Sequence, residues 1–436
     1  MLESVTKEFK SVLTLHYDET DPALVKPVRW CQRNIVNMFR ITSETFIERT
    51  LEKVQKVFMG FISILALPVA YPLAFVGVSI KLIRGATTAP LQDSPFEINH
   101  QKLANENLKT KSKEVLDRDW NLSRYFGHVR VMNLPWDEES FQKITDPEER
   151  RKRVEDNKAR WQIVTESLRE VGCNSYERFS SVVGINLPER LWRRMDHNYK
   201  NFDRSTPEGQ KKFEGLSKGQ TGCYMSHYRI VKEANENWEQ AKADYAQIQS
   251  QIDTPSNESD LAVLNQKLVE AQERIKKYSS VLILEDDNRF GRVLDPVKKT
   301  YTLEKVGRVF HKAMSELPLN YEIFFLAACP SHLEAVAHTP HIRKFLDGVE
   351  LNAYAVHSRF YKTLILQLEK IETEEGPLTA VDKEIPKTMP EAHVFMSAPP
   401  VAFQGGFKSS LSQDEKPEPF RQWMNGDWNN SLLTAV

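Results

Sequence analysis

The sequence contains few cysteines, and they form no pattern that would stabilise a fold. Its four cysteines lie far apart in a chain of 436 residues, and no two of them form a CxxC pair. This usage argues against a disulfide scaffold or a structural zinc site, and it is typical of a reducing compartment. The sequence also lacks an excess of one charge, because 59 basic and 60 acidic residues leave a net charge of −1. Proteins that bind nucleic acid carry a basic surface, so no nucleic-acid partner is expected.

A secretory signal peptide is not expected at the N-terminus, since the first 20 residues carry charges and no continuous apolar core. An apolar run follows at residues 57–80, where 24 residues carry no charge. A helix of this length would measure about 36 Å, enough to cross the hydrocarbon core of a bilayer. Pro68 and Pro72 interrupt the run, so a re-entrant hairpin fits it as well as one kinked span does. Membrane attachment is the favoured interpretation, and a buried core helix is the alternative.

Composition divides the chain into four parts. Residues 1–84 are expected to form an N-terminal helical region around the membrane segment, and the polar residues 85–120 a linker. Residues 121–412 have the length of one catalytic domain, and the polar, Pro-containing residues 413–436 form a tail. We therefore expect a membrane-associated protein whose catalytic domain lies in the cytoplasm.

Strand and helix patterns alternate within the predicted catalytic domain. The sequence predicts a strand over 128–135, a charged helix over 146–171 and a second strand over 176–183. The later elements continue this pattern, with strands over 281–284, 321–326 and 352–356 and a helix over 359–368. The alternation predicts an α/β fold, with a mixed, mostly parallel sheet flanked by helices.

Residues 235–277 interrupt this alternation with two helical patterns. Apolar residues recur at helical spacing on both sides of residues 254–259, which carry strong turn and capping signals. We expect an antiparallel helical hairpin inserted into the catalytic domain. A purely structural role is the favoured interpretation, and an arm that binds a partner is the alternative.

Three acidic residues follow a short apolar strand pattern. Glu285, Asp286 and Asp287 come directly after Val281–Leu284, and ligands bind outside the carboxyl ends of buried parallel strands. Adjacent carboxylates repel one another unless a cation lies among them, and Mg²⁺ or Mn²⁺ prefers carboxylate and phosphate oxygens. Because side chains alternate along a strand, Glu285 and Asp287 should face one side and Asp286 the other. The pattern predicts a divalent-cation site on Glu285 and Asp287, and an acidic turn in solvent is the alternative.

A second group of polar residues lies at 219–227, with the sequence Gly-Gln-Thr-Gly-Cys-Tyr-Met-Ser-His. Glycines such as Gly222 let a ligand approach the backbone, and a helix that starts here would direct free N–H groups at phosphate or sugar oxygens. Ser226 and His227 add a hydroxyl and an imidazole at the start of that helix. Cys223 is more simply a core cysteine than a nucleophile paired with His227. His227 is likewise more simply a hydrogen-bonding or structural residue than a metal ligand.

The first predicted strand ends in Asn133-Leu-Pro135. Nucleotides bind at strand ends in open α/β sheets, so a nucleotide is expected near Asn133. The basic residues Arg150–Arg153 follow on the charged helix, where most of them are expected to be solvated.

Taken in order, these motifs resemble those of glycosyltransferase family 25, which includes bacterial lipooligosaccharide galactosyltransferases and the collagen galactosyltransferases. The resemblance covers about residues 126–412, and its specific part is the Gly-Cys-x-x-Ser-His motif together with Glu-Asp-Asp. The matching segments are Asn133-Leu-Pro135, Gly222-Cys-Tyr-Met-Ser-His227, Ile283-Leu-Glu-Asp-Asp287, Tyr321–Leu326, Asn352–Val356 and Ala380-Val-Asp382. The sequence departs from the family at Trp136-Asp-Glu-Glu139, where basic residues are more usual, and in the inserted hairpin.

The resemblance implies a GT-A-like fold, a nucleotide-sugar donor of the UDP-hexose type, and inversion at the anomeric carbon. The expected product is galactose or glucose transferred to a saccharide, a lipid-linked glycan or a protein acceptor. The residues expected to bind the donor are Asn133, Gly222, Ser226 and Asp286.

A cation on Glu285 and Asp287 would neutralise the departing diphosphate as a Lewis acid. An inverting displacement also needs a base that accepts the proton of the acceptor hydroxyl. Asp382 is the first candidate for this base and His227 the second. For Asp382, an N-cap or a supporting role is the alternative.

Two other functions are compatible with the sequence. One is an inactive, membrane-tethered module whose hairpin binds a partner, and the other is a metal-dependent hydrolase of nucleotide sugars. The three consecutive acids favour an active enzyme over a scaffold, because a carboxylate cluster is costly to maintain without a function.

Overall fold

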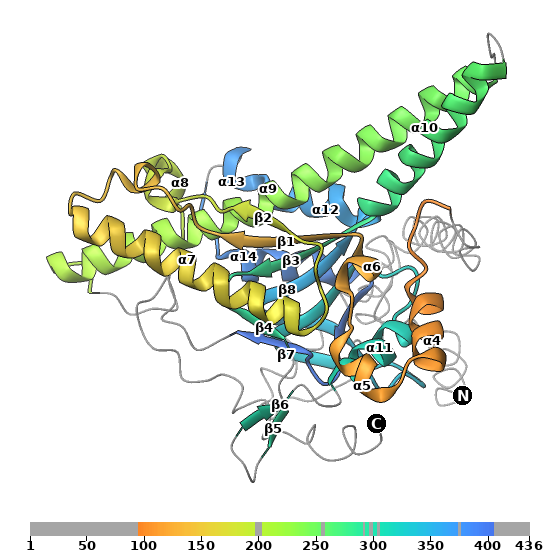
Figure 1. Cartoon of the computed structure of the whole chain (residues 1–436). Helices are drawn as coiled ribbons and strands as arrows, with labels where there is room; N and C mark the ends of the chain where they lie inside the picture. Colours follow the sequence, from red (N-terminus) through yellow and green to blue (C-terminus); the bar gives the residue numbers. More distant parts are fainter. Residues whose placement is uncertain are drawn as a thin grey trace, which may run out of the picture. The chain divides into compact units, whose positions relative to one another are not determined.

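The computed structural model describes residues 95–196, 203–253, 258–290, 293–295, 300–302, 306–373 and 376–404 (Figure 1). The predicted N-terminal region 1–84, its membrane segment 57–80 and the tail 413–436 lie outside these residues. Within the described ranges, no helix is both long enough and apolar enough to cross a membrane.

A six-stranded mixed sheet lies at the centre of the described chain, with the strand order β2-β1-β3-β8-β7-β9. Five of its strands run in one direction, and β8 runs antiparallel to its neighbours. The predicted α/β class, with a mixed and mostly parallel sheet, is confirmed. The strands are β1 (His128–Asn133), β2 (Glu177–Ser180), β3 (Ser280–Glu285), β7 (Ile323–Ala335), β8 (Ile342–His357) and β9 (Val394–Ser397).

The order of the first three strands creates a switch point in the sheet. Strand β1 pairs with β2 on one side and with β3 on the other, and all three run parallel. The chain therefore leaves β1 in one direction and returns on its other side, and in open α/β sheets such a switch point marks the crevice beyond the carboxyl ends of the strands, here β1 and β3. Met132 lies opposite Glu285 in the register, so Asn133 and the acidic residues meet at this edge.

Alternate side chains of the central strands enter two separate cores. Val129 and Leu284 belong to the core on one face, and Met132 and Ile283 belong to the core on the other. Helix α7 (Pro147–Glu170) covers the first face, which we call the α7 face, and α9 (Pro207–Ile252) covers the second, the α9 face (Figure 1). The α7 face is completed by α4 (His100–Thr110), α6 (Leu122–Phe126) and α11 (Val306–Glu316), and α5 (Lys113–Arg118) packs against α11.

The prediction of a linker over residues 85–120 is wrong for residues 95–120, which the structure describes. Residues 100–118 form α4 and α5, whose N-termini are capped by Asn99 and Ser112. Trp120 is fully buried, and its ring stacks on Phe310 of α11 with 5.1 Å between ring centroids. The segment reads as polar because its helices bury only one narrow side and expose the rest.

The α9 face carries the predicted helical hairpin. Helix α9 and α10 (Glu258–Lys277) are antiparallel, and Arg274 of α10 lies 2.7 Å from Asp244 of α9. Figure 1 shows the pair projecting beyond the sheet. The hairpin is confirmed, but its first helix begins at Pro207 and not near residue 235, so one continuous helix forms both the cover of the sheet and the arm.

Shorter elements complete the described fold. Helices α12 (Ser358–Leu368) and α14 (Val381–Glu384) pack on the α9 face. The remaining elements are η2 (Glu139–Phe141), η3 (Gly184–Asn186), α8 (Glu189–Trp192), α13 (Lys370–Thr373), η4 (Ile385–Glu391), and two small sheets made of β4 (Asn288–Phe290) with β10 (Ala402–Gln404) and β5 (Val293–Asp295) with β6 (Thr300–Thr302).

Candidate functional site

The three consecutive acids at the end of β3 are divided between the two faces of the sheet. Asp286 contacts Arg160 of α7, whereas Glu285 contacts His227 of α9. Asp287 follows in the turn after β3 and is only 6% exposed. Its charge acts on both Arg160 and Cys223, so it lies within electrostatic reach of either side. The alternation predicted for Glu285 and Asp286 is therefore confirmed.

Asp286 is held on the α7 face by two donors. Arg160 Nη1 donates to one carboxylate oxygen at 3.0 Å, and Asn133 Nδ2 donates to the other at 2.8 Å. Burial raises the pKa of Asp286, and these two donors act against that rise. Burial lowers the pKa of Arg160, but the charges of Asp286 and Asp287 outweigh it and raise that pKa. Asp286 is thus part of an internal ion pair.

Asn133 organises the end of β1. Besides Asp286, its amide donates to the carbonyl of Asn157 at 3.0 Å. Its Oδ1 accepts from Trp136 Nε1 at 2.7 Å and from Arg178 Nε at 3.1 Å. These contacts give Asn133 a positioning role beside the crevice, and the predicted donor-binding role of Asn133 and Asp286 stays a prediction.

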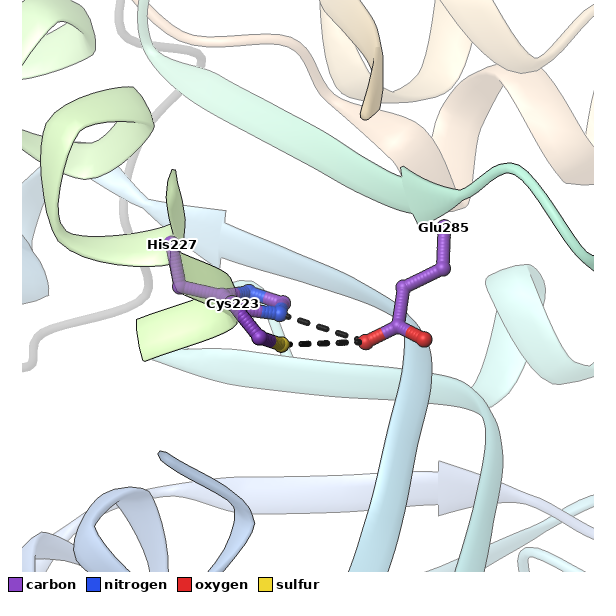
Figure 2. Close-up of side chains that lie close together, drawn as sticks. All are labelled: Cys223, His227 and Glu285. Atoms are coloured by element: carbon purple, nitrogen blue, oxygen red, sulfur yellow. Dashed lines mark hydrogen bonds and ion pairs between the residues drawn. The ribbon is translucent and has the colours of Figure 1, made fainter. Parts of the chain in front are cut away.

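Glu285 faces two residues of α9 (Figure 2). His227 Nε2 lies 3.3 Å from Glu285 Oε1, and Cys223 Sγ lies 3.9 Å from the same oxygen. The other nitrogen of His227, Nδ1, lies 2.8 Å from the hydroxyl of Tyr354 on β8. Burial and the charges of Glu285, Asp382 and Asp287 raise the pKa of the Cys223 thiol well above its usual value. Burial, together with Cys223 and Glu285, also raises the pKa of Tyr354, so its hydroxyl stays protonated.

These three side chains have the ligand types and spacing to hold a metal ion. The sulfur, imidazole nitrogen and carboxylate oxygen of Cys223, His227 and Glu285 all lie within 4.8 Å of one another. This set differs from the metal ligands predicted from the sequence, Glu285 and Asp287, and it includes Cys223, which was predicted to be a core cysteine. Cys223 is partly exposed.

Asp382 reaches the same region from α14. It lies in the first turn of that helix, and its charge acts on the Cys223 thiol together with those of Glu285 and Asp287. The N-cap of α14 is Ala380, so the alternative role of Asp382 as an N-cap is wrong. The fold therefore places the predicted base within electrostatic reach of Cys223, as it does the predicted cation ligands, although Asp382 lies about 95 residues further along the chain.

The glycine-containing segment 219–227 does not start a helix. It lies inside α9, where its N–H groups are used by the helix itself, so the anion site predicted at a helix N-terminus is wrong. A Cβ on Gly222 would lie 2.6 Å from the Val182 carbonyl oxygen, so the glycine allows close contact with the chain before η3. Ser226 Oγ donates to the Gly222 carbonyl at 2.7 Å and accepts from the Val182 N–H at 2.9 Å. Gly222 and Ser226 thus dock α9 on this loop, and their predicted contact with the donor is untested.

Replacement of Gly222 by alanine should lower the free energy of unfolding by about 1–3 kcal/mol, because the new methyl group overlaps backbone atoms that cannot move aside easily. Gly215 is a matched control in the same helix, since a Cβ there meets nothing within 4 Å. Gly215→Ala should raise the free energy of unfolding by up to about 1 kcal/mol. Urea unfolding of both variants measures the difference, and equal effects would show that close packing at Gly222 is not required.

Sequence reasoning missed two residues that shape the site. Arg160 lies on the buried stripe of α7 together with Asn157, Val164 and Leu168, and a basic residue on such a stripe is a signal for a buried ion pair. Tyr354 belongs to a strand pattern that was recognised, but nothing in the sequence pairs its hydroxyl with His227 from α9. The basic cluster Arg150–Arg153 lies largely at the surface, as predicted.

A scan of the chain against protein-family models finds no match, and a search of curated proteins also finds none. The resemblance to glycosyltransferase family 25 therefore rests on the motifs in this sequence.

Proposed function

We propose that this protein is a divalent-cation-assisted hexosyltransferase with a GT-A-like catalytic domain. The observation that carries the proposal is that Glu285 contacts His227 and Cys223 of α9, while the charges of Asp287 and Asp382 also act on Cys223. The crevice lies beyond the carboxyl ends of β1 and β3, at the switch point where α/β proteins bind their ligands. Several carboxylates gathered at one end of a sheet favour a ligand that brings positive charge.

The carboxylates at the end of β3 differ in what they are able to bind. Asp286 is engaged with Arg160 and Asn133 on the α7 face, and we assign the cation to Glu285 and Asp287. Glu285 is about a quarter exposed, so its carboxylate is accessible from the crevice. Carboxylate oxygens fit Mg²⁺ or Mn²⁺, which keeps other positions for diphosphate oxygens. Such a cation supplies Lewis-acid neutralisation of the departing nucleoside diphosphate.

The proton of the acceptor hydroxyl needs a base. Asp382 suits this role because it is partly exposed and lies in the first turn of α14, at the edge of the same cluster. His227 is less suited, because it is 1% exposed and both of its ring nitrogens already have neighbours, Tyr354 and Glu285. We therefore assign the base to Asp382, held within reach of an acceptor that enters from the side of α14.

A screen of nucleotide-sugar donors tests the proposal. The full chain is used, because residues 95–120 pack into the catalytic unit and a fragment starting at 120 would lose them. With Mn²⁺ present, one UDP-hexose should release UDP slowly without an acceptor and faster with a suitable glycan. UDP release that no acceptor accelerates would favour the hydrolase. A protein that neither binds a donor nor releases UDP from one would favour a non-catalytic scaffold.

We further propose that residues 57–80 attach the protein to a membrane, on the basis of the uncharged run of 24 residues. Extraction with alkaline carbonate should leave the full chain with the membrane fraction and release a variant lacking 57–80. Release of both would contradict attachment.

A further inference from the structure

A second ligand set is built around Glu285, and it differs in chemistry from the predicted all-oxygen site. Cys223 and His227 are four residues apart in α9, so their side chains leave the same face of the helix one above the other. Glu285 faces them from the end of β3 (Figure 2). The cluster thus offers one sulfur, one nitrogen and one oxygen ligand from two rigid elements.

The spacing of these atoms agrees with a tetrahedral ion. Bonds of about 2.0–2.3 Å at tetrahedral angles separate ligand atoms by roughly 3.3–3.6 Å. The Glu285 oxygen lies 3.3 Å from His227 Nε2 and 3.9 Å from Cys223 Sγ. The third pair, Cys223 Sγ and the His227 ring nitrogen, lies within 4.8 Å.

His227 is also oriented in the way that metal-binding imidazoles are. Its ring is buried and stacks on the ring of Tyr354, with 5.7 Å between centroids. The Tyr354 hydroxyl at Nδ1 is a partner that can accept the Nδ1 proton, which leaves the Nε2 lone pair directed at Glu285 and Cys223. The contact between His227 and Tyr354 involves no carboxylate, and it orients His227 for binding a metal ion.

We propose that Cys223, His227 and Glu285 bind Zn²⁺ through three protein ligands and leave a fourth position open. Sulfur and imidazole ligands favour Zn²⁺ over Mg²⁺ and Mn²⁺, which prefer oxygen. Asp287 and Asp382 add negative charge around the ion without being required as ligands. Because Glu285 is shared, bound Zn²⁺ excludes the oxygen-bound cation of the transferase reaction. This last step rests on the proposed function, whereas the zinc site itself does not.

The zinc site is tested on the full chain with Co²⁺ as a spectroscopic probe and with Zn²⁺ itself. The parent protein should bind one Co²⁺ with an intense near-ultraviolet thiolate-to-cobalt band, and Zn²⁺ should displace it. Cys223→Ser should abolish the band, and the control Cys173→Ser should keep it, because Cys173 is buried in the other core. A parent protein without the band, or a Cys223→Ser variant that retains it, would overturn the proposal.

Two further measurements do not depend on the folding of the cysteine variant. X-ray absorption of the zinc-loaded parent should show one sulfur ligand at about 2.3 Å, and a shell without sulfur would overturn the site. Tyr354→Phe should weaken Zn²⁺ binding by about 10–100-fold, the usual effect of removing a partner that orients a ligand. An unchanged affinity for Zn²⁺ would show that Tyr354 does not orient His227 for metal binding.

Competition separates this site from the proposed activity. Free Mn²⁺, measured by electron paramagnetic resonance, should increase when Zn²⁺ is added to the Mn²⁺-loaded protein. Mn²⁺ that stays bound would contradict the sharing of Glu285. A zinc site with its sulfur ligand in a protein that uses no nucleotide sugar would refute the transferase proposal and leave the zinc site standing.

Discussion

Replacement of Asp287 by asparagine should lower the rate of nucleoside-diphosphate release by about 10²- to 10³-fold and leave the protein folded. The asparagine keeps the shape of the side chain but removes the negative charge that holds a cation against the leaving diphosphate. Asp287 lies in the turn after β3 and contributes to the charge around Cys223 and Arg160, so its loss affects the cluster on both sides. The rate is measured with saturating donor and over a range of Mn²⁺ concentrations.

An exposed acid provides the control for this substitution. Asp156 lies on the solvent side of α7, and Asp156→Asn removes the same charge outside the crevice. Its rate should equal that of the parent protein. Equal rates for Asp287→Asn and the parent would remove Asp287 from the site, and a loss in both variants would indicate a nonspecific effect of net charge.

Arg160→Met should lower the free energy of unfolding by about 3–5 kcal/mol, the usual cost of breaking a buried ion pair by removing one partner. The substitution leaves the Asp286 carboxylate buried with only Asn133 as a donor. The double variant Arg160→Met with Asp286→Asn should recover part of the loss, because the charge of Asp286 is then removed together with that of its partner. Urea unfolding of the two single variants and the double variant gives the coupling energy.

Arg153→Met is the matched control for Arg160. Arg153 lies in the same helix but pairs with Glu149 at the surface, at 3.0 Å, with both side chains more than a third exposed. Such pairs contribute little, so this variant should change stability by less than about 1 kcal/mol. A similarly small effect of Arg160→Met, or a double variant no better than the single ones, would contradict an internal ion pair at Asp286.

Local patterns were sufficient to predict the central fold. The apolar run before Glu285 and the alternating residues after His128 are strands, as their patterns predicted, and both strands are buried on both faces. Side-chain alternation also predicted that Glu285 and Asp286 would separate. The prediction failed at 219–227, where the glycines suggested the start of a helix and the structure has the interior of one. Gly222 lies inside α9, where a glycine is needed because the loop at Val182 and Gly184 packs closely against the helix. Only the tertiary structure reveals that contact.

At the candidate site, too, the sequence did not predict contacts between residues that lie far apart in the chain. Its carboxylates were visible as a motif, but their partners come from distant elements that the sequence does not connect. Arg160 reaches Asp286 from 126 residues away, and Tyr354 reaches His227 from 127 residues away. Cys223 was assigned to the core because a single cysteine near a histidine has no specific spacing, yet the helix places both beside Glu285.

The central claim is that the end of β3 binds a divalent cation together with the diphosphate of a nucleotide sugar. Titration calorimetry of UDP binding to the full chain, with and without Mn²⁺, tests it most directly. Because a shared cation couples the two ligands, UDP should bind at least about 10-fold more tightly with Mn²⁺, and Asp287→Asn should abolish this difference. Equal UDP affinity with and without Mn²⁺, or no UDP binding in either condition, would contradict the claim.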